Sequence, residues 1–368
     1  MSKSQHIGKA VVEENLITGF LNQPRIELHC MLLTRALTKQ TPQLATKSIS
    51  RANCFGSSIK MLPPLSDTFP DLIRSKFSSA VDAGSLTFTP STEKDVPAGD
   101  LIFRVRVAPS LAQKPVPTRE HDEAPKAKFN PFLNPEPDLF LCDLGDRYSL
   151  ILNKFSIVPY HFLCITKKFE PQRAPLSEED LSATWECLQA NVKSGSRLLA
   201  FYNCGELSGA SQEHKHIQFI PVPHDLKLLP DIALSYGIPV SKDAIGQFPT
   251  SHPGVAFAHF VLPVPKNPST DDLVMRFSSL LARTLTTLRE QGQRTISFNF
   301  AMTKDWMFLA PRGQESYGGV SVNATGMVGL LLAKSEEQLD FIKNTGPLEV
   351  TARVGLPRIT EDEQQHDY

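Results

Sequence analysis

The sequence lacks several features that would assign it to common classes. No uninterrupted stretch of 18 apolar residues is present, so it offers no candidate transmembrane helix. Its six cysteines, at positions 30, 54, 142, 164, 187 and 204, include no CxxC pair. This spacing disfavours a disulfide framework and a structural zinc site, and it predicts buried, reduced thiols in an intracellular protein. Neither a GxxxxGKS/T motif nor a strand–GxGxxG–helix unit occurs, which disfavours P-loop and Rossmann nucleotide sites.

Charge of one sign is also missing. The chain carries 38 Lys and Arg against 39 Asp and Glu, a net charge of -1, and its pI is about 6.8. Such a balance predicts no general attraction to nucleic acid or to a membrane surface. A polyphosphate ligand would therefore need positive charge concentrated locally. The 368 residues, 41% of them apolar, suffice for one large domain or two ordinary ones.

Acidic residues are absent from positions 29–60, where basic residues recur among Ser, Thr and Leu. That composition is typical of a transit peptide, although Glu13, Glu14 and Glu27 lie upstream. We interpret residues 1–60 as an N-terminal extension that is disordered, transit-like or placed before a true start at Met61. Residues 61–368 are expected to form the catalytic domain.

Hydrophobic periodicity predicts helices and strands in alternation, with no internal repeat in the sequence. Strands followed by single helices, with hairpin-like pairs, indicate the α+β class and an antiparallel sheet. The long Pro-rich, charged stretch 114–137 is expected to be a loop, and 223–253 to be loop-rich. Helices are predicted at 67–83, 177–200, 271–291 and 335–343, and strands at 101–107, 148–152, 162–166, 216–222, 257–262, 296–301, 307–310 and 328–333.

The most informative stretch is FYNCGELSGASQEHKHIQFIPVP, residues 201–223. In a strand, His214, His216 and Gln218 project from one face, because side chains alternate. The small residues 208–212 just upstream form a loop whose backbone N–H groups and hydroxyls can approach an anion. A phosphate-binding loop beside neutral imidazoles is suited to nucleophilic attack on phosphorus.

An isolated HxH has other interpretations. Either histidine can be a core residue, or the pair can share a zinc ion with a third ligand. A zinc hydrolase built on this pair is therefore one alternative. The in-phase Gln218 and the small-residue loop favour a nucleophile, because a metal-binding strand needs neither. Candidates for a third ligand are His161, His224, His252 and His259, of which His161 and His259 read as structural histidines.

The string SGASQ-x-HKH-x-Q resembles the active-site strand of fungal diadenosine tetraphosphate phosphorylases, also called ATP adenylyltransferases. These enzymes belong to the histidine-triad and galactose-1-phosphate uridylyltransferase superfamily. The similarity extends from about Leu62 to about Pro357. It includes, in order, PSLAQKP (109–115), LILNKFSIVPYHFLCIT (150–166), FAHFVLPVP (257–265) and SVNATGMVGLLLAK (321–334).

The resemblance implies a histidine-triad-like antiparallel sheet with flanking helices, organised as two related halves. It implies that His216 becomes adenylylated, that His214 orients it or contacts phosphate, and that Gln218 contacts phosphate where hydrolytic relatives have a third histidine. The sequence departs from the family pattern at Ala324 and Leu330. The residues implied to bind nucleotide or polyphosphate are Lys114, Asn153, Lys154, Asn203, Gly209, Ala210, Ser211, Gln212, Asn323, Ala324, Thr325, Leu330 and Lys334.

The expected reaction is phosphorolysis of diadenosine tetraphosphate to ADP and ATP through an adenylyl-histidine. The alternatives are a hexose-1-phosphate nucleotidyltransferase and a non-catalytic adenine-nucleotide-binding protein. A divalent cation, with magnesium expected, would assist, and no organic cofactor is expected. Beyond its small-molecule substrates we expect no nucleic-acid or membrane partner, and a monomer. We expect a cytoplasmic protein, also nuclear, with a mitochondrial isoform if residues 1–60 are a transit peptide.

Overall fold

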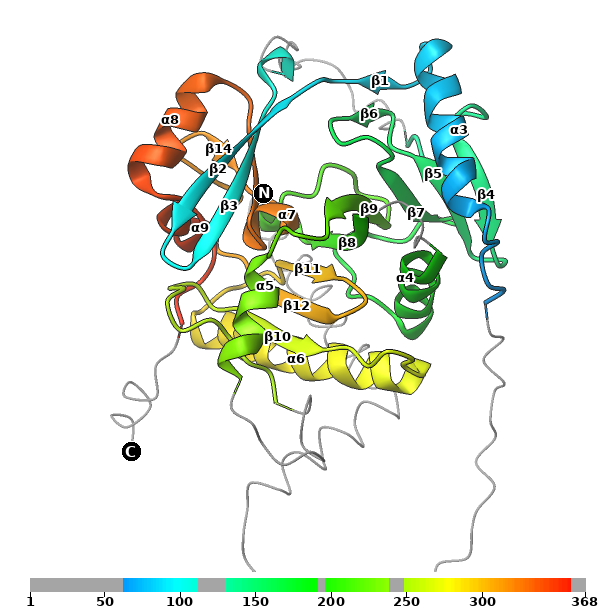
Figure 1. The fold of residues 1–368 in the computed structure, drawn as a ribbon. Coiled ribbons are helices and arrows are strands. Elements are labelled where there is room, and N and C mark those ends of the chain that lie inside the picture. The colour runs from blue at the N-terminus through cyan, green and yellow to red at the C-terminus, as the bar shows by residue number, and fades with distance from the viewer. Residues whose placement is uncertain (1–61, 112–129, 191–195, 238–247, 359–368) are drawn as a thin grey trace, which may run out of the picture. The chain divides into compact units, whose positions relative to one another are not determined.

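The centre of the protein is one antiparallel sheet of eight strands. The structure is a computed structural model that describes residues 62–111, 130–190, 196–237 and 248–358. All neighbouring strands of the large sheet are antiparallel, which confirms the α+β class expected from the sequence. Across the sheet (Figure 1) the order is β10 (Phe260–Pro263), β12 (Trp306–Pro311), β11 (Phe298–Met302), β8 (Ser196–Cys204), β9 (His216–Pro223), β7 (Phe162–Thr166), β5 (Tyr148–Leu152) and β4 (Phe140–Leu144).

The sheet consists of two halves with the same topology. In the first, β7 is followed by helix α4 (Glu178–Ala190) and the hairpin β8–β9, and β9 returns to pair with β7. In the second, β10 is followed by helix α6 (Thr270–Glu290) and the hairpin β11–β12, and β12 returns to pair with β10. The halves meet where β8 pairs with β11. This relation is visible in the fold, whereas the sequence shows no repeat.

The strand registers align the two halves residue by residue. In each half, the first residue of the leading strand pairs with the fourth residue of the returning strand: Phe162 with Phe219, and Phe260 with Leu309. The first and third residues of the returning strand are therefore equivalent. They are His216 and Gln218 in β9, and Trp306 and Phe308 in β12. Directly before the leading strand stand His161 in the first half and His259 in the second.

Helices α4 and α6 cover one face of the large sheet, where α4 contacts β8 and α6 contacts β12. Phe277 of α6 meets Phe300 of β11 on that face, with ring centroids 5.7 Å apart. Side chains alternate along a strand, so Ala301 and its partner Phe201 point to the other face. Gln218 pairs with Phe201 and shares this second face. His216 therefore lies on the face that α4 and α6 leave uncovered.

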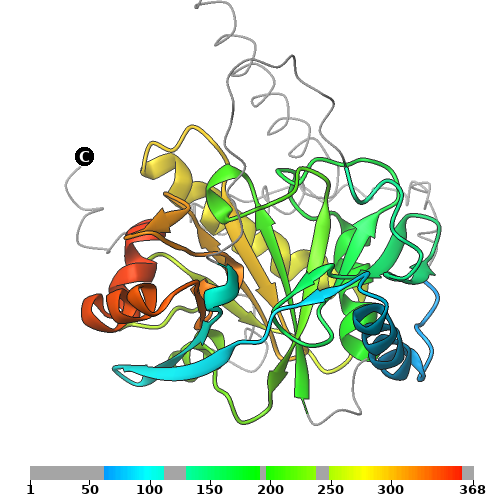
Figure 2. The ribbon, with the colours of Figure 1, turned by 90° about the horizontal axis from the view of Figure 1, so that it is seen from above.

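A smaller sheet contributes to the core on the second face. It contains β2 (Thr92–Ala98), β3 (Leu101–Val107) and β15 (Leu330–Ala333), in the order β15-β3-β2. Val105 of β3 belongs to one buried cluster with Phe201 and Phe308 of the large sheet. Helix α3 (Phe69–Asp82) lies at the opposite end of the molecule from the C-terminal helices (Figure 2). The remaining elements are β1 (Thr87–Phe88), β6 (Phe155–Ser156), α5 (Leu229–Ala233), β13 (Ser316–Tyr317), β14 (Val320–Ser321), α7 (Ala324–Met327), α8 (Glu336–Thr345), α9 (Pro347–Val354) and three short 3₁₀ turns at Pro109–Leu111, Glu206–Ser208 and Leu234–Tyr236.

Most of the expected elements are present. Strands β3, β5 and β7 have the predicted limits, and β9, β11, β12, β15 and helices α3, α6 and α8 differ from them by a few residues. The expected strand 257–262 begins later, at Phe260, and Phe257 instead forms an isolated bridge to Pro357. Most of the expected loop 114–137 lies outside the described residues. Within the described ranges, none of the helices combines the length and hydropathy that spanning a membrane requires.

One predicted helix is wrong in its second part. The helix expected at 177–200 ends at Ala190, and residues 196–204 form strand β8. Residues 198–204 are all buried, because β8 lies in the middle of the sheet. A strand buried on both faces lacks the apolar–polar alternation that identifies a strand in a sequence. In α3, Ile73 and Phe77 are buried and Val81 is exposed.

Candidate active site

His216 is the first residue of β9, in the interior of the sheet. It is only 3% exposed. It pairs with Ile165 of β7, and its ring lies 5.2 Å from that of Phe132, centroid to centroid. The site is therefore a buried imidazole in a largely apolar setting, on the sheet face described above.

A backbone hydrogen bond determines the tautomer of His216. Its Nδ1 lies 2.8 Å from the carbonyl oxygen of His214, and a carbonyl can only accept. The hydrogen is therefore on Nδ1, which leaves the lone pair on Nε2. Burial lowers the pKa of His216 to about 4, against the smaller opposing effect of this hydrogen bond. The ring is neutral at pH 7, with a nucleophilic Nε2.

The side chain of His214 is held by protein atoms on both ring nitrogens. Its Nε2 donates to the carbonyl oxygen of Thr166 at 2.7 Å. Its Nδ1 lies 3.0 Å from Nδ2 of Asn130, whose Oδ1 accepts from the backbone N–H of Phe132. His214 is thus anchored to neighbouring segments, and its own carbonyl orients His216.

This geometry bears on the zinc alternative. Both nitrogens of His214 and Nδ1 of His216 already have hydrogen-bond partners within the protein. Across the four described segments, no three histidine, cysteine or acidic side chains gather as metal ligands. The His214–His216 pair therefore has the geometry of a positioned nucleophile and not that of a shared metal site.

Gln172 fills a gap between β8 and β9 beside the nucleophile. The last β8–β9 pair before His216 is Phe201 with Gln218. Beyond it, the buried Gln172 amide accepts from the N–H of His216 at 2.8 Å and donates to the carbonyl oxygen of Asn203 at 2.9 Å. A side-chain amide thus replaces the missing strand pairing, a role that the sequence analysis did not identify.

Directly before β9, Lys215 is held in a buried charge network. Its Nζ lies 2.8 Å from Asp180 Oδ2 and 3.2 Å from Glu170 Oε2. Asp180, which is fully buried, also accepts from Tyr148 Oη at 2.7 Å. Because Asp180 stands in the first turn of α4, this network ties the helix to the residue between His214 and His216.

The turn before the small-residue loop requires glycine at position 205 and is closed by the Ser208 hydroxyl. Gly205 has φ 84°, and a Cβ there would lie 2.2 Å from the carbonyl oxygen of Ile296, so only glycine fits. Ser208 is fully buried and donates its hydroxyl to the carbonyl of Gly205. The expectation that the loop hydroxyls donate to an anion is therefore wrong for Ser208. Gly209 and Ala210 are half-buried, and Ser211 and Gln212 are exposed.

Asn203 connects two of the implied nucleotide-binding segments. Its Oδ1 accepts from Nδ2 of Asn299 and from the backbone N–H of Ala324, both at 2.9 Å. Arg312, also fully buried, donates to Asn299 Oδ1 and to the carbonyl oxygen of Val322. Asn203 therefore joins β8 to the 322–324 segment through a buried polar network.

Asn323 and Thr325 also engage each other. Asn323 is the N-cap of α7, because its Oδ1 accepts from the N–H groups of Thr325 and Gly326. The Thr325 hydroxyl lies 2.7 Å from the same Oδ1. Together with the close approach of Gly209 to Asn323, these contacts bring the small-residue loop and the 323–325 segment side by side.

The other implied residues differ in their surroundings. Asn153 directs its Nδ2 to Nδ1 of His161 at 2.9 Å. Lys154 is ion-paired with Glu136 at 2.6 Å. Leu330 and Lys334 lie on and just after β15, in the smaller sheet, and Lys334 is exposed. Lys114 lies outside the described residues.

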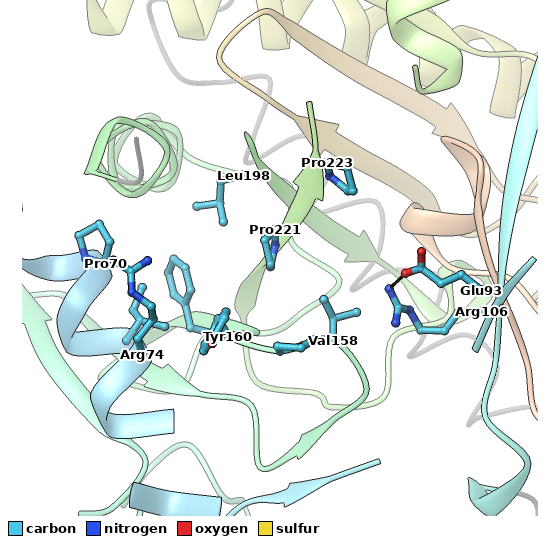
Figure 3. Close-up of a pocket in the computed structure, with 12 residues that line it drawn as sticks. Pro70, Arg74, Glu93, Arg106, Val158, Tyr160, Leu198, Pro221 and Pro223 are labelled. Atoms are coloured by element: carbon cyan, nitrogen blue, oxygen red, sulfur yellow. Dashed lines mark hydrogen bonds and ion pairs between the residues drawn. The ribbon is translucent and has the colours of Figure 1, made fainter. Parts of the chain in front are cut away.

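A cavity of about 290 Å³ lies away from this site, between α3 and the β2–β3 hairpin (Figure 3). Its β9 residues, Pro221 and Pro223, follow His216 by five and seven positions. At about 3.3 Å per residue this places it roughly 16 Å or more along the strand. Both of its guanidinium groups are ion-paired, Arg74 with Asp71 and Arg106 with Glu93. The cavity is therefore separate from the His216 site.

Comparison with known proteins agrees with this geometry. A family model for the Ap4A phosphorylase N-terminal domain matches residues 60–234, and one for the ATP adenylyltransferase C-terminal domain matches residues 253–357. Diadenosine 5',5'''-P1,P4-tetraphosphate phosphorylase 2 of Saccharomyces cerevisiae is 35% identical over 289 residues, covering 73% of this chain and 88% of that protein. The chain belongs to the Ap4A phosphorylase family. It is a nucleotidyltransferase of the ATP adenylyltransferase type, as the resemblance implied.

Other comparisons with the Ap4A phosphorylase family agree. Protein APA1 of S. cerevisiae is 31% identical over 317 residues, covering 81% of this chain and 97% of that protein. The crystal structure of yeast Ap4A phosphorylase Apa2 in complex with Ap4A superposes with a TM-score of 0.69 at 30% identity, covering 80% of this chain and all of that one. The complex of Apa2 with AMP superposes with a TM-score of 0.70. The two family models coincide with the two halves of the sheet, the first containing β9 and the second β12.

Proposed function

We propose that this protein catalyses the phosphorolysis of diadenosine tetraphosphate to ADP and ATP, with His216 as the nucleophile. The observation that carries the proposal is the hydrogen bond from Nδ1 of His216 to the carbonyl of His214, which leaves Nε2 as a neutral nucleophile. The relatives named for this activity support the choice of substrate.

In the first step, Nε2 of His216 attacks the α-phosphorus of the dinucleotide. A P–N bond forms, the bridging P–O bond breaks, and ATP leaves with the electron pair. The imidazole gains positive charge as it is adenylylated, and the His214 carbonyl stabilises that charge through Nδ1–H. Because the leaving group is itself a phosphate anion, a strong general acid is not required, so the neutral Gln218 is acceptable beside the nucleophile.

In the second step, an oxygen of inorganic phosphate attacks the adenylyl phosphorus and the P–N bond breaks. ADP leaves and neutral His216 is restored. The chain contributes positioning and hydrogen-bond donors more than proton transfer. The donors that we assign to the phosphates are the Gln218 amide and the N–H groups of residues 209–212.

A magnesium ion would neutralise charge on the polyphosphate. The described residues contain no set of three carboxylate, histidine or cysteine ligands, and magnesium commonly binds through substrate phosphates. We therefore propose that it enters with the substrate, and none of the steps above depends on a protein-held metal. We also propose that the enzyme acts as a monomer, and from its scattered cysteines that it is cytoplasmic.

The covalent intermediate provides the test. The protein is incubated with Ap4A labelled in the adenylyl group, quenched, and examined for acid-labile, base-stable label on His216 by peptide mapping. Wild type is expected to trap label, and His216→Ala is expected to trap none. His259→Ala is the matched control, because His259 is also buried and also donates Nδ1–H to the carbonyl two residues earlier.

Three outcomes distinguish the alternatives. Cleavage of Ap4A without trapped label refutes the covalent scheme. Binding of Ap4A without cleavage indicates a nucleotide-binding protein. If the protein becomes labelled but releases the label only to a hexose-1-phosphate acceptor, it is a sugar nucleotidyltransferase.

A further inference from the structure

A chain of three polar side chains approaches the nucleophile from the start of β7. Asn153 Nδ2 lies 2.9 Å from His161 Nδ1. His161 Nε2 in turn lies 3.1 Å from Gln218 Oε1. His161 is 7% exposed and Gln218 is half-buried. The chain therefore ends on the residue two positions after His216 on the same sheet face.

The direction of every hydrogen bond in this chain follows from its first member. Nδ2 of Asn153 also lies 3.3 Å from the carbonyl oxygen of Phe155. A carbonyl accepts only, so this end of the Asn153 side chain must be the NH₂ group. That group donates to Nδ1 of His161, whose hydrogen is then on Nε2. This N–H donates to Oε1 of Gln218.

The hydrogen bond from His161 determines which end of the Gln218 amide remains available to a ligand. Its oxygen is engaged by His161, and among the described residues no protein acceptor contacts its nitrogen. The NH₂ group is left to bind an external acceptor next to His216. Burial lowers the pKa of His161 to about 4, which keeps Nδ1 able to accept from Asn153 at neutral pH.

The second half of the sheet supplies an internal comparison. His259 occupies the position equivalent to His161, but its Nδ1 donates to the carbonyl of Phe257 and its Nε2 accepts from the N–H of His252. Its tautomer is thus the opposite of that of His161. The residue equivalent to Gln218 is Phe308, which His259 meets only by ring contact, 6.2 Å between centroids. The tautomer with its hydrogen on Nε2 is that of His161, in the half that carries the nucleophile.

We propose that His161 is a positioning residue that, anchored by Asn153, holds the Gln218 amide with its NH₂ group toward the phosphate attacked by His216. This inference rests on the function proposed above. An amide rotated by 180° would present its oxygen to a phosphate anion and repel it. Asn153 acts in this arrangement through His161, in addition to any contact that it makes with the nucleotide.

The orientation of the amide is tested by Gln218→Glu. This variant keeps an oxygen facing His161 and replaces the NH₂ group by a carboxylate oxygen facing the phosphate. A hydrogen bond to a charged group is commonly strong enough to change a rate by about tenfold to a hundredfold. We expect the single-turnover rate of His216 adenylylation to fall by at least that factor, as in Gln218→Leu. A rate within about threefold of wild type would overturn the proposal, because the nitrogen would not be the donor.

The role of His161 is tested by substitutions that differ in which imidazole nitrogen they mimic. His161→Leu removes both, His161→Asn mimics Nδ1, and His161→Gln places an N–H near the position of Nε2. We expect adenylylation to slow by about tenfold to a hundredfold in the first two and to recover in His161→Gln. His259→Leu is the matched control for loss of a buried imidazole, and thermal unfolding monitors the folded fraction of each variant.

A double-mutant cycle shows whether His161 acts through Gln218. In the Gln218→Leu background, adding His161→Leu is expected to slow adenylylation by less than about threefold more. Equal losses in both backgrounds, or no recovery in His161→Gln, would overturn the inference while leaving the function intact. Failure of the function itself has a different signature, since wild type would then form no adenylyl-His216.

Discussion

The Gln172→Leu substitution tests whether the Gln172 amide stabilises the gap between β8 and β9 beside His216. The substitution keeps a similar volume but leaves two buried backbone groups, the N–H of His216 and the carbonyl of Asn203, without their partner. Each unpaired buried group costs about 1–3 kcal/mol, so the free energy of unfolding should fall by about 2–6 kcal/mol. That is a large part of the roughly 5–15 kcal/mol that stabilises a typical protein.

The assay is urea unfolding of wild type, Gln172→Leu and Gln291→Leu, followed by circular dichroism. Gln291 is exposed, so its substitution controls for the change of residue type. We also expect the rate of His216 adenylylation in folded Gln172→Leu to fall, because the backbone of the nucleophile loses an anchor. A loss of stability below about 0.5 kcal/mol, the range of ordinary surface substitutions, would refute this account of Gln172.

Two further predictions concern charge. Lys215→Met should lower the free energy of unfolding by about 3–5 kcal/mol, because it removes the closest cation from the buried carboxylate of Asp180, which keeps only the more distant Arg147 at 4.0 Å among its described ion pairs. In urea unfolding, adding Asp180→Asn should recover part of the loss, and a Lys215→Met protein as stable as wild type would contradict the network. Stability should also fall as the pH is lowered from about 6.5 toward 4, because His161, His216 and His259 have pKa values of about 4 in the fold and near 6.5 when unfolded. In that window the unfolded chain binds more protons than the folded protein, so the free energy of unfolding rises with pH. Above pH 7 these three histidines add no pH dependence. A series of urea titrations at different pH values measures this dependence, and a free energy of unfolding that stays constant from pH 4.5 to 6.5 would contradict the prediction.

The parts of the site that the sequence predicted are those that a local pattern encodes. The strand with His214, His216 and Gln218 on one face follows from alternation over a few residues, and the structure shows that strand from His216 onward. The helix expected at 271–291 is α6, whose start the Ser269 side chain caps in the structure. The central strand β8 was missed because a strand buried on both faces has no alternation.

The residues around the nucleophile could not be found by local patterns. Gln172 lies 44 positions from His216, and Asn130 lies 84 positions from His214. Neither residue has neighbours that mark it in the sequence. His161 read as a structural histidine, and its contact with Gln218, 57 positions away, gives it a further role. Such contacts exist only once β5, β7 and β9 lie side by side.

The amino-acid sequence by itself determined the antiparallel α+β class, the shared face of His216 and Gln218 on β9, and the family membership implied by SGASQ-x-HKH-x-Q. These depend on residues that are close together in the chain. Tertiary structure alone decided the tautomers of His161 and His214, the gap that Gln172 fills, and the register that makes His216 equivalent to Trp306. The physical reason is that a ring hydrogen and an amide orientation are set by the acceptor or donor that folding brings within about 3 Å, whatever its distance along the chain.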